Sequence, residues 1–419
     1  MNAAYYDPLF YLCSDEMPFT IRIETTFKDE VDPRLLTAAV TKALRRYPYF
    51  SIRIVREGGE WLTVPNDLPP VVYPGPEVRD LGSEGVNRHL FALSYEGKKV
   101  NFFISHVITD GAGLNPFLKS TVYYYLTARY GVTLDVPDVR LADDPLLPGE
   151  TDAPYPEERM KNAILFSRAI DRPFFRLTEG GRVRDERRIV YRVRFREADV
   201  FRVNRSADGS PSSLFSSIMY RVIRRLHPDE PRDIVSAVSF NMRPALGCRN
   251  TYRMLCSAIR VFFPERLKNA DIGTLCTCAR GIVSLQSEPS NVLCAMENRR
   301  KMLSTLETLP EIADKKAFLA PLALKDATDN TFSVSFVGRL GYGDMEKYIE
   351  SIYNITDGST YRTLFMEISS VNGWFDVAFL QGFSSDVYYR GFLEEAEALG
   401  IAFVEDGTME FDTPGIELP

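Results

Sequence analysis

Histidine is scarce in this chain, and one of its three copies, His89, His106 and His227, stands where an imidazole could do chemistry. A neutral imidazole is the usual general base near pH 7. His106 lies towards the end of an almost wholly apolar run, residues 100–108 (VNFFISHVI). His227 follows a predicted helix and is expected to be solvated, and His89 is expected in a surface helix. His106 is therefore the candidate base.

The spacing from His106 to Asp110 and Gly111 suits a base that is held by its own loop. Asp110 comes after a turn, from where its carboxylate could pair with a distant arginine and keep the imidazole fixed at the mouth of a cavity. Gly111 allows backbone conformations that other residues resist. So short a pattern also arises by chance, and the alternative is a structural histidine at a strand-to-helix turn.

Periodicity places this loop between a strand and a helix in the first half of the chain. The apolar run at 100–108 is typical of a strand that is buried on both faces. Residues 115–130 have helical spacing, with Pro116 near the first turn. Upstream, the pattern predicts a strand over 20–27, a helix from Asp32 and Pro33 to about Pro48, a strand over 51–55 and a hairpin strand over 61–64.

A similar strand-helix-strand outline begins again near residue 187. We expect strands over 191–196, 234–240, 255–263, 332–337, 361–369 and 373–380, and helices over 212–226, roughly 270–308, and 386–399. The proline-rich, acidic stretch at 132–160 is expected to be an extended crossover. The two halves share one outline, which predicts an α+β fold in which a mixed sheet with flanking helices occurs twice.

The composition is that of an acidic globular protein. The 419 residues include 50 Lys and Arg and 57 Asp and Glu, a net charge of −7. This balance gives no electrostatic reason to bind nucleic acid or an anionic membrane. Arg192, Arg194 and Arg196 alternate with apolar residues in one predicted strand. We therefore expect them on the solvated face of that strand, and an anion-binding arginine row is the alternative.

The six cysteines do not form a recognisable framework. Their spacing gives no CxxC pair and no zinc motif, so we expect no metal site and reduced thiols in the cytoplasm. The first residues show neither the basic nor the apolar segment of a signal peptide. No stretch approaches the ~18 uninterrupted apolar residues of a membrane span. We expect a cytoplasmic protein without nucleic-acid or membrane partners.

The stretch SHVITDG at residues 105–111 resembles the HxxxDG motif of the CoA-dependent acyltransferase superfamily. That superfamily includes chloramphenicol acetyltransferase, the plant BAHD enzymes, alcohol and polyketide-associated acetyltransferases, and the condensation domains of peptide synthetases. Four further stretches are similar to its phrases: residues 31–50, ending in RRYPYF; SFNMRP at 239–244, like N-x-R-P; SFVGRL at 335–340, like S-N-x-G but with Phe336 in place of Asn; and NGW at 372–374.

The resemblance implies a fold of two chloramphenicol-acetyltransferase-like lobes with the active-site channel between them. The motif occurs early in a long chain, as in the two-lobed, monomeric branch. The implied division is an N-terminal lobe over 1–150 that carries the motif, a crossover linker over 151–185 and a C-terminal lobe over 186–419. Ser105 stands where condensation domains usually have a second histidine, which favours a free-standing acyltransferase.

By the same resemblance, His106, Asp110 and Gly111 are the catalytic residues. His106 takes the proton from an acceptor hydroxyl or amine as it attacks the thioester carbonyl, so no acyl-enzyme is needed. Asp110 is assigned a structural ion pair with Arg243 of the N-x-R-P stretch. The implied reaction moves an acyl group, acetyl by preference, from CoA to a small-molecule acceptor.

The remaining candidates concern the oxyanion and the cosubstrate. Ser333 and Ser335 are oxyanion candidates, and Gly113, Gly338 and Arg339 are candidates for binding CoA or substrate. Acyl-CoA is the expected cosubstrate, and no cofactor is expected to stay bound. Two alternatives remain open: acyl transfer from an acyl or peptidyl carrier protein, and a non-catalytic relative that binds a ligand in the channel.

Overall fold

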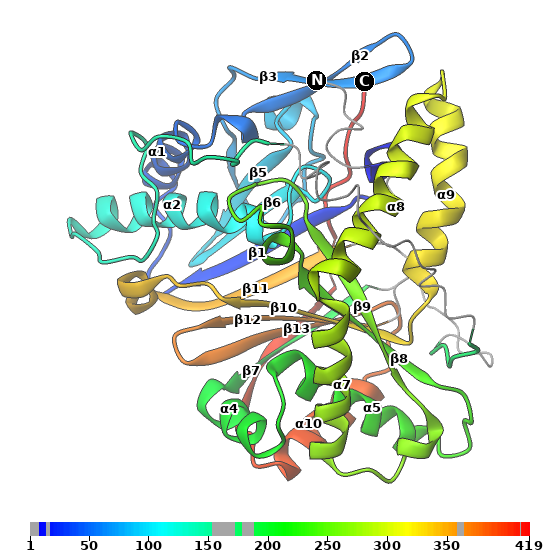
Figure 1. Cartoon of the computed structure of the whole chain (residues 1–419). Coiled ribbons are helices and arrows are strands. Elements are labelled where there is room, and N and C mark those ends of the chain that lie inside the picture. Colours follow the sequence, from blue (N-terminus) through cyan, green and yellow to red (C-terminus); the bar gives the residue numbers. More distant parts are fainter. Residues whose placement is uncertain (1–7, 14–16, 153–171, 178–187, 358–363, 411) are drawn as a thin grey trace.

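The structure is a computed structural model, and it describes residues 8–13, 17–152, 172–177, 188–357, 364–410 and 412–419. Two large β-sheets are its main layers, and a separate small hairpin flanks the first of them (Figure 1). Helices cover the outer faces of the large sheets. This confirms the two-lobed α+β architecture that the sequence predicts.

The N-terminal sheet has β1 near its centre and is covered on one face by two helices. Its five strands run in the order β11 (Ile349–Asp357), β1 (Thr20–Phe27), β6 (Lys99–Ser105), β5 (Phe91–Glu96) and β4 (Val72–Pro74). The helices are α1 (Pro33–Leu44) and α2 (Gly111–Tyr130), and the flanking hairpin consists of β2 (Ile52–Glu57) and β3 (Glu60–Pro65). Asp32 caps α1 by accepting hydrogen bonds from two main-chain N–H groups, as expected.

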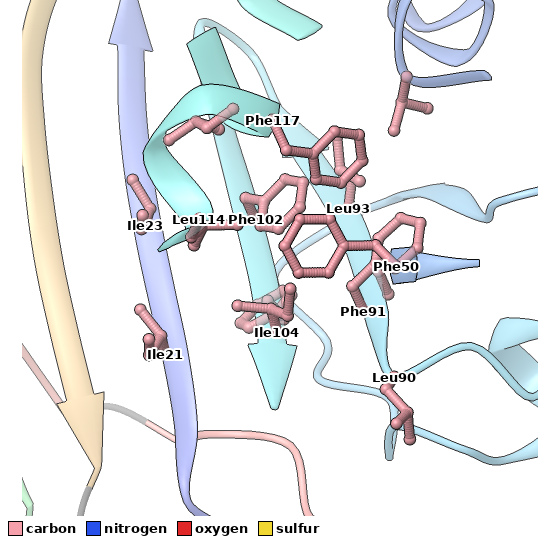
Figure 2. Close-up of a cluster of buried hydrophobic side chains, with 14 of the residues drawn as sticks. Ile21, Ile23, Phe50, Leu90, Phe91, Leu93, Phe102, Ile104, Leu114 and Phe117 are labelled. Carbon is pink, nitrogen blue, oxygen red and sulfur yellow. The ribbon is translucent and has the colours of Figure 1, made fainter. Parts of the chain in front are cut away.

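Alternating apolar side chains hold α2 against this sheet. Ile23 of β1 and Phe102 and Ile104 of β6 lie beside Leu114 and Phe117, which come from the first turns of the helix (Figure 2). The strand period of two thereby meets one face of a helix. Burying one such side chain contributes roughly 1.5–3 kcal/mol. The start of α2, and with it the turn between β6 and α2, is therefore fixed by the core.

The C-terminal sheet has seven strands and four helices on its outer face. The strand order is β14 (Phe403–Glu410), β7 (Ile189–Arg196), β13 (Trp374–Gln381), β12 (Leu364–Val371), β10 (Phe332–Arg339), β8 (Ile234–Asn241) and β9 (Cys256–Phe263). The helices are α4 (Glu197–Ser206), α5 (Pro211–Leu226), α7 (Ile272–Gln286) and α10 (Val387–Ala398). Asn372 and Gly373 join β12 to β13 with φ of 53° and 77°, the left-handed conformation that a two-residue type I′ turn requires.

Two segments of the C-terminal half belong to the N-terminal lobe. Strand β11 pairs antiparallel with β1 over its whole length, from Thr20 with Asp357 onwards. After β14, the chain returns to the N-terminal lobe, where Ile416 bridges to Leu81. The predicted boundary at residue 186 therefore separates the chain less cleanly than expected, because a strand from beyond it completes the first sheet. Most of the predicted crossover, 151–185, lies outside the described residues.

Helices α8 (Pro289–Glu307) and α9 (Ile312–Thr328) form a hairpin that reaches from the C-terminal lobe to the N-terminal one (Figure 1). At its base, Met296 is buried with residues of the short helix α6 (Arg243–Leu246). At its tip, Lys315 pairs with Glu60 at 2.9 Å. The hairpin therefore contacts both lobes.

Several expectations for single side chains are wrong. His89 is buried rather than in a surface helix, because Leu68 accepts a hydrogen bond from its Nε2 at 2.8 Å and Phe91 packs on its ring. Arg192 and Arg194 are not on a solvated face. They point between the lobes, where Arg192 pairs with Glu24 of β1 and Arg194 with Asp376 at 2.8 Å. Buried carboxylates, rather than solvent, satisfy these arginines.

Three further features concern disulfide bonds, metal binding and membrane spans. No disulfide joins any of the six cysteines, all of which lie within the described ranges. Within the described ranges, no group of three or more His, Cys, Asp and Glu side chains could hold a metal ion. In the same ranges, no helix has both the length and the apolar character needed to cross a membrane.

Candidate active site

His106 is the first residue after β6, in the turn that leads to α2. Its main-chain N–H donates to the carbonyl oxygen of Phe19 at 2.6 Å, which ties the turn to the start of β1. Its Nδ1 lies 2.9 Å from the carbonyl oxygen of Thr109. A carbonyl only accepts hydrogen bonds, so Nδ1 carries the hydrogen and Nε2 keeps its lone pair. The half-buried imidazole can therefore accept a proton at Nε2.

Asp110 is the N-cap of α2 and is buried at the junction of the lobes. Its Oδ1 accepts a hydrogen bond from the N–H of Gly113 at 2.9 Å. The N-terminus of a helix carries a partial positive charge, which favours a carboxylate at this position. Asp110 thus caps α2 and fixes the position of its first turn.

The predicted ion pair between Asp110 and Arg243 is present. Nη2 of Arg243 lies 2.8 Å from Oδ1, and Nη1 lies 2.9 Å from Oδ2. Leu255 adds a third donor, its main-chain N–H, at 2.7 Å from Oδ2. Both charged side chains are less than 5% exposed. Charge-assisted, bidentate pairs of this kind are among the stronger hydrogen bonds in proteins.

The guanidinium of Arg243 is held by the segment 241–255, which we call the docking segment. Nε donates to the carbonyl of Thr251 at 2.9 Å and Nη2 to the carbonyl of Arg253 at 2.6 Å. Nη1 also donates to the side chain of Asn241 at 3.2 Å. A planar fork of five N–H donors matches this set of acceptors, and a lysine would not. The docking segment therefore fixes Arg243, which fixes Asp110.

Gly111, the last residue of the motif, and Gly113, two residues further on, have different surroundings. Gly111 is the first residue of α2 and has no positive φ; a Cβ there would meet only Val337 of β10, at an ordinary 3.5 Å. Gly113 is buried against the docking segment, where a Cβ would overlap the carbonyl oxygen of Tyr252. Gly113 is thus needed for the contact between the lobes, and its predicted place in a CoA or substrate site is not supported by its surroundings.

The oxyanion candidates lie on β10, on the face of the C-terminal sheet that is turned towards the N-terminal lobe. Val334 belongs to the outer core, so Ser333 and Ser335 point the other way. The hydroxyl of Ser333 donates to Asn330 at 3.3 Å. In the described part of the chain, no hydrogen bond joins either serine to His106. Their role as oxyanion donors remains a prediction.

Ser333 also lines a small polar cavity. Ala237 and Ser239 of β8, Ala258 and Arg260 of β9, and Asp329 and Asn330 before β10 make the rest of its wall. Arg260 and Asp329 pair with each other across it. Small side chains on three neighbouring strands leave this space open on the inner face of the sheet.

Gly338 and Arg339 end β10. Gly338 has a φ of 83°, a left-handed conformation that favours glycine. The guanidinium of Arg339 lies 2.8 Å from Glu197 of α4 and stacks over Phe201. The pair uses Nε alone, and the rest of the guanidinium is exposed. Its role in CoA binding remains a prediction.

The sequence-based search missed Thr109 and Tyr252. The Thr109 hydroxyl donates to the Tyr252 carbonyl at 2.7 Å, and the two residues are 143 positions apart. The Tyr252 ring stacks on Tyr49 with centroids 4.0 Å apart. A threonine inside the motif and aromatic residues after N-x-R-P were the available signals, but neither has a spacing that identifies its partner.

Comparisons with known proteins bear on the fold. No family model matches the chain, and no curated protein matches it either. Solved structures do match. Polyketide synthase associated protein 5 from Mycobacterium tuberculosis superposes with a TM-score of 0.60 at 11% identity, covering 92% of this chain and 95% of that one. The first condensation domain of the CDA synthetase gives 0.61 at 12% identity, covering 96% and 98%.

A third match holds ligands. TRI101 from F. sporotrichioides, complexed with coenzyme A and T-2, gives a TM-score of 0.56 at 11% identity and covers 96% of this chain and 99% of that one. At such identities the likeness shows the fold. The chain has the two-lobed fold shared by condensation domains and CoA-dependent acetyltransferases.

Proposed function

We propose that the chain is an acyltransferase that moves an acyl group, acetyl by preference, from a CoA thioester to a hydroxyl or amine of a small molecule. The observation that carries this proposal is the His106 imidazole, whose Nδ1–H is bonded to the Thr109 carbonyl so that Nε2 is free to act as a base. The fold supports the proposal, because its structural neighbours include an acetyltransferase and a protein complexed with coenzyme A.

In the proposed reaction, Nε2 of His106 takes the proton of the acceptor as the acceptor attacks the thioester carbonyl. The tetrahedral intermediate collapses by breaking the carbon–sulfur bond, and the imidazolium returns the proton to the CoA thiolate. No acyl-enzyme forms. Asp110 and Arg243 hold the turn in place, and Ser333 or Ser335 supplies a hydrogen bond to the oxyanion. We assign Gly338 and Arg339, at the end of β10, to binding of the cosubstrate.

The molecular setting belongs to the same proposal. We assign acyl-CoA as a cosubstrate with no permanently bound cofactor, and a monomer in the cytoplasm, where the thiols of the six cysteines would stay reduced. We also keep the division into lobes at 1–150 and 186–419, amended by the placement of β11 and the C-terminal segment.

The test is thiol release from acetyl-CoA in the presence of pooled alcohols and amines, with products identified by mass spectrometry. His106→Ala is expected to lose 10²–10⁴-fold in rate, the usual contribution of a positioned base, while its circular dichroism spectrum stays unchanged. Acylated carrier protein is offered in a parallel reaction. Activity with that donor alone would replace CoA as the donor, and a His106→Ala variant as active as the parent would remove the proposed mechanism.

A further inference from the structure

We propose that Thr109 is a positioning residue that makes the orientation of the His106 imidazole depend on the docking of segment 241–255. The inference rests on the proposed function, in which His106 is the base. In this role Thr109 does not contact the substrate. Its task is to hold the ring nitrogen that does not take part in the reaction.

Thr109 is bonded to the two halves of the chain through two different atoms. Its carbonyl oxygen accepts the hydrogen bond from Nδ1 of His106 at 2.9 Å. Its hydroxyl donates to the carbonyl of Tyr252 at 2.7 Å. The residue itself is fully buried. Because both atoms belong to one short residue, a displacement of the Tyr252 carbonyl moves the acceptor that orients the imidazole.

The Tyr252 carbonyl is itself held in place. The main-chain N–H of Tyr252 donates to the carbonyl of Glu150 at 3.1 Å. Its ring is stacked on Tyr49, whose hydroxyl donates to the Glu150 carboxylate at 2.6 Å. That carboxylate is paired with the buried Arg46. The acceptor of the Thr109 hydroxyl is thus part of a network of hydrogen bonds between the docking segment and the N-terminal lobe.

Gly113 gives independent support for a close contact at this point. A Cβ on Gly113 would overlap the Tyr252 carbonyl oxygen and would lie 2.6 Å from Oγ1 of Thr109. The two atoms of the hydrogen bond therefore occupy the space that any other residue would fill. Glycine within a helix is less favourable than alanine, because its backbone loses more conformational freedom on folding. At Gly113 the missing side chain allows the docking segment to approach the histidine turn closely.

The chemical consequence is a fixed tautomer. With Nδ1–H bonded to the Thr109 carbonyl, the lone pair stays on Nε2. If the Thr109 carbonyl shifts, the ring can rotate and exchange tautomers. A smaller fraction of molecules then has the lone pair on a correctly oriented Nε2. A misplacement of about 1 Å in a catalytic group can cost about 10²-fold in rate.

The kinetic test uses Thr109→Val, which keeps the shape of the side chain and removes its hydroxyl. We expect kcat to fall between tenfold and a hundredfold with KM changed less than twofold, and Thr109→Ser to restore kcat. The control is Thr121→Val, which removes a different buried hydroxyl, one that lies within α2 and donates to the carbonyl of Phe117. A Thr109→Val variant with the same kcat as Thr121→Val would overturn the proposal.

A second test does not need activity. The chain has three histidines, so its ¹⁵N imidazole signals can be assigned with single substitutions at each. In the unmodified protein, His106 is expected as the Nδ1–H tautomer, and in Thr109→Val the two ring nitrogens are expected to average. An Nε2–H tautomer in the unmodified protein, or an unchanged spectrum in Thr109→Val, would overturn the proposal even if acyl transfer is confirmed. If no substrate is ever turned over, this spectrum still decides the role of Thr109.

A third variant approaches the same bond from the helix. Gly113→Ala is expected to push apart Thr109 and Tyr252 and to lower kcat as Thr109→Val does. Gly281→Ala is the matched control, since a Cβ at this helical position meets no atom within 4 Å. If Gly113→Ala and Gly281→Ala both kept the kcat of the unmodified protein, the proposed coupling would be contradicted.

Discussion

At the scale of single residues, the site depends on Asp110, whose carboxylate is bonded to three groups at once. It caps α2 through Gly113, pairs with Arg243 and accepts the N–H of Leu255. Each donor compensates part of the cost of burying the charge. The carboxylate therefore joins the helix that follows His106 to a segment from the other half of the chain.

Asp110→Asn is expected to destabilise the protein by about 3–5 kcal/mol, because it leaves the charge of Arg243 buried without its partner. Asparagine keeps the size and the capping ability of the aspartate. Urea unfolding measures the effect. Arg243→Met is expected to cost a similar amount, and the double variant little more than either single one, since both remove the same pair.

The matched control is an exposed pair, Arg45 with Asp143, whose side chains are 65% and 89% exposed. Asp143→Asn is expected to change the free energy of unfolding by less than about 0.5 kcal/mol. Additive effects of Asp110→Asn and Arg243→Met would contradict the assignment of a coupled pair.

His89 predicts how stability depends on pH. Burial lowers the pKa of its imidazole, and its Nδ1 has no hydrogen-bond partner within the described residues. The unfolded chain takes up a proton near pH 6.5 that the folded state takes up only at lower pH. The stability contributed by the neutral ring is therefore present above pH 6.5 and is lost as the pH falls below it.

The measurement is urea unfolding at pH 7.5, 6.5 and 5.5. Comparing the unmodified protein with His89→Gln cancels the titration of all other groups, and glutamine keeps a donor for the Leu68 carbonyl. We expect the unmodified protein to lose more stability than the variant on going to pH 5.5. Parallel losses would show that His89 does not cause the dependence.

At the scale of elements, the C-terminal segment after β14 acts as part of the N-terminal lobe. The N–H of Leu81 donates to Gly415 at 2.9 Å, and the N–H of Glu417 donates to Leu81 at 2.8 Å. The side chain of Ile416 is 8% exposed and belongs to the same core as α2. The last residues of the chain therefore stabilise the lobe that carries the motif.

Ile416→Ala is expected to lower the free energy of unfolding by about 2–5 kcal/mol, as for other buried Ile to Ala changes. Val404→Ala, at a β14 position that is 53% exposed, serves as the control and is expected to cost under about 1 kcal/mol. Thermal or urea unfolding distinguishes the two. Equal losses would place Ile416 outside the core.

Local patterns predicted the elements around the site and failed for those that depend on distant partners. Neighbouring residues alone define three of the patterns: the apolar run before His106, the Asp32 cap and the helical spacing after Asn115. These patterns predict β6, α1 and α2. The Asp110–Arg243 pair came from the motif resemblance. Strand β11 was missed, since its pairing with β1 is made across more than 300 positions of the chain.

Other misses have the same cause. Strand β14 contains Glu405, Asp406 and Glu410 and is largely exposed, so it lacks the alternation that predicts a strand. Thr109 attracts no notice in the sequence because its importance depends on the Tyr252 carbonyl. The type of a residue does not show which side chain will contact its main-chain carbonyl. Partners of this kind become visible only once the two halves are placed together.

At the scale of the whole molecule, the two lobes share elements and cannot be separated by one cut. The first sheet needs β11 from the second half, the histidine turn needs the docking segment, and Arg192 of β7 pairs with Glu24 of β1. A fragment that ends before residue 188 would lack all three. The site therefore exists only where both halves are folded and docked.

The two tryptophans can test this interdependence, since each lobe contains one. Trp61 lies in β3 and Trp374 at the start of β13. Trp61→Phe leaves a fluorescent reporter in the C-terminal sheet, and Trp374→Phe leaves one in the N-terminal lobe. We expect urea unfolding, followed by fluorescence and by far-ultraviolet circular dichroism, to give one shared midpoint within each variant, because a lobe that lost β11 or the docking segment would expose its core. Fluorescence and circular dichroism midpoints that differ within one variant would instead mean that the lobes unfold independently, and the docking of segment 241–255 could then not be required for the fold of the N-terminal lobe.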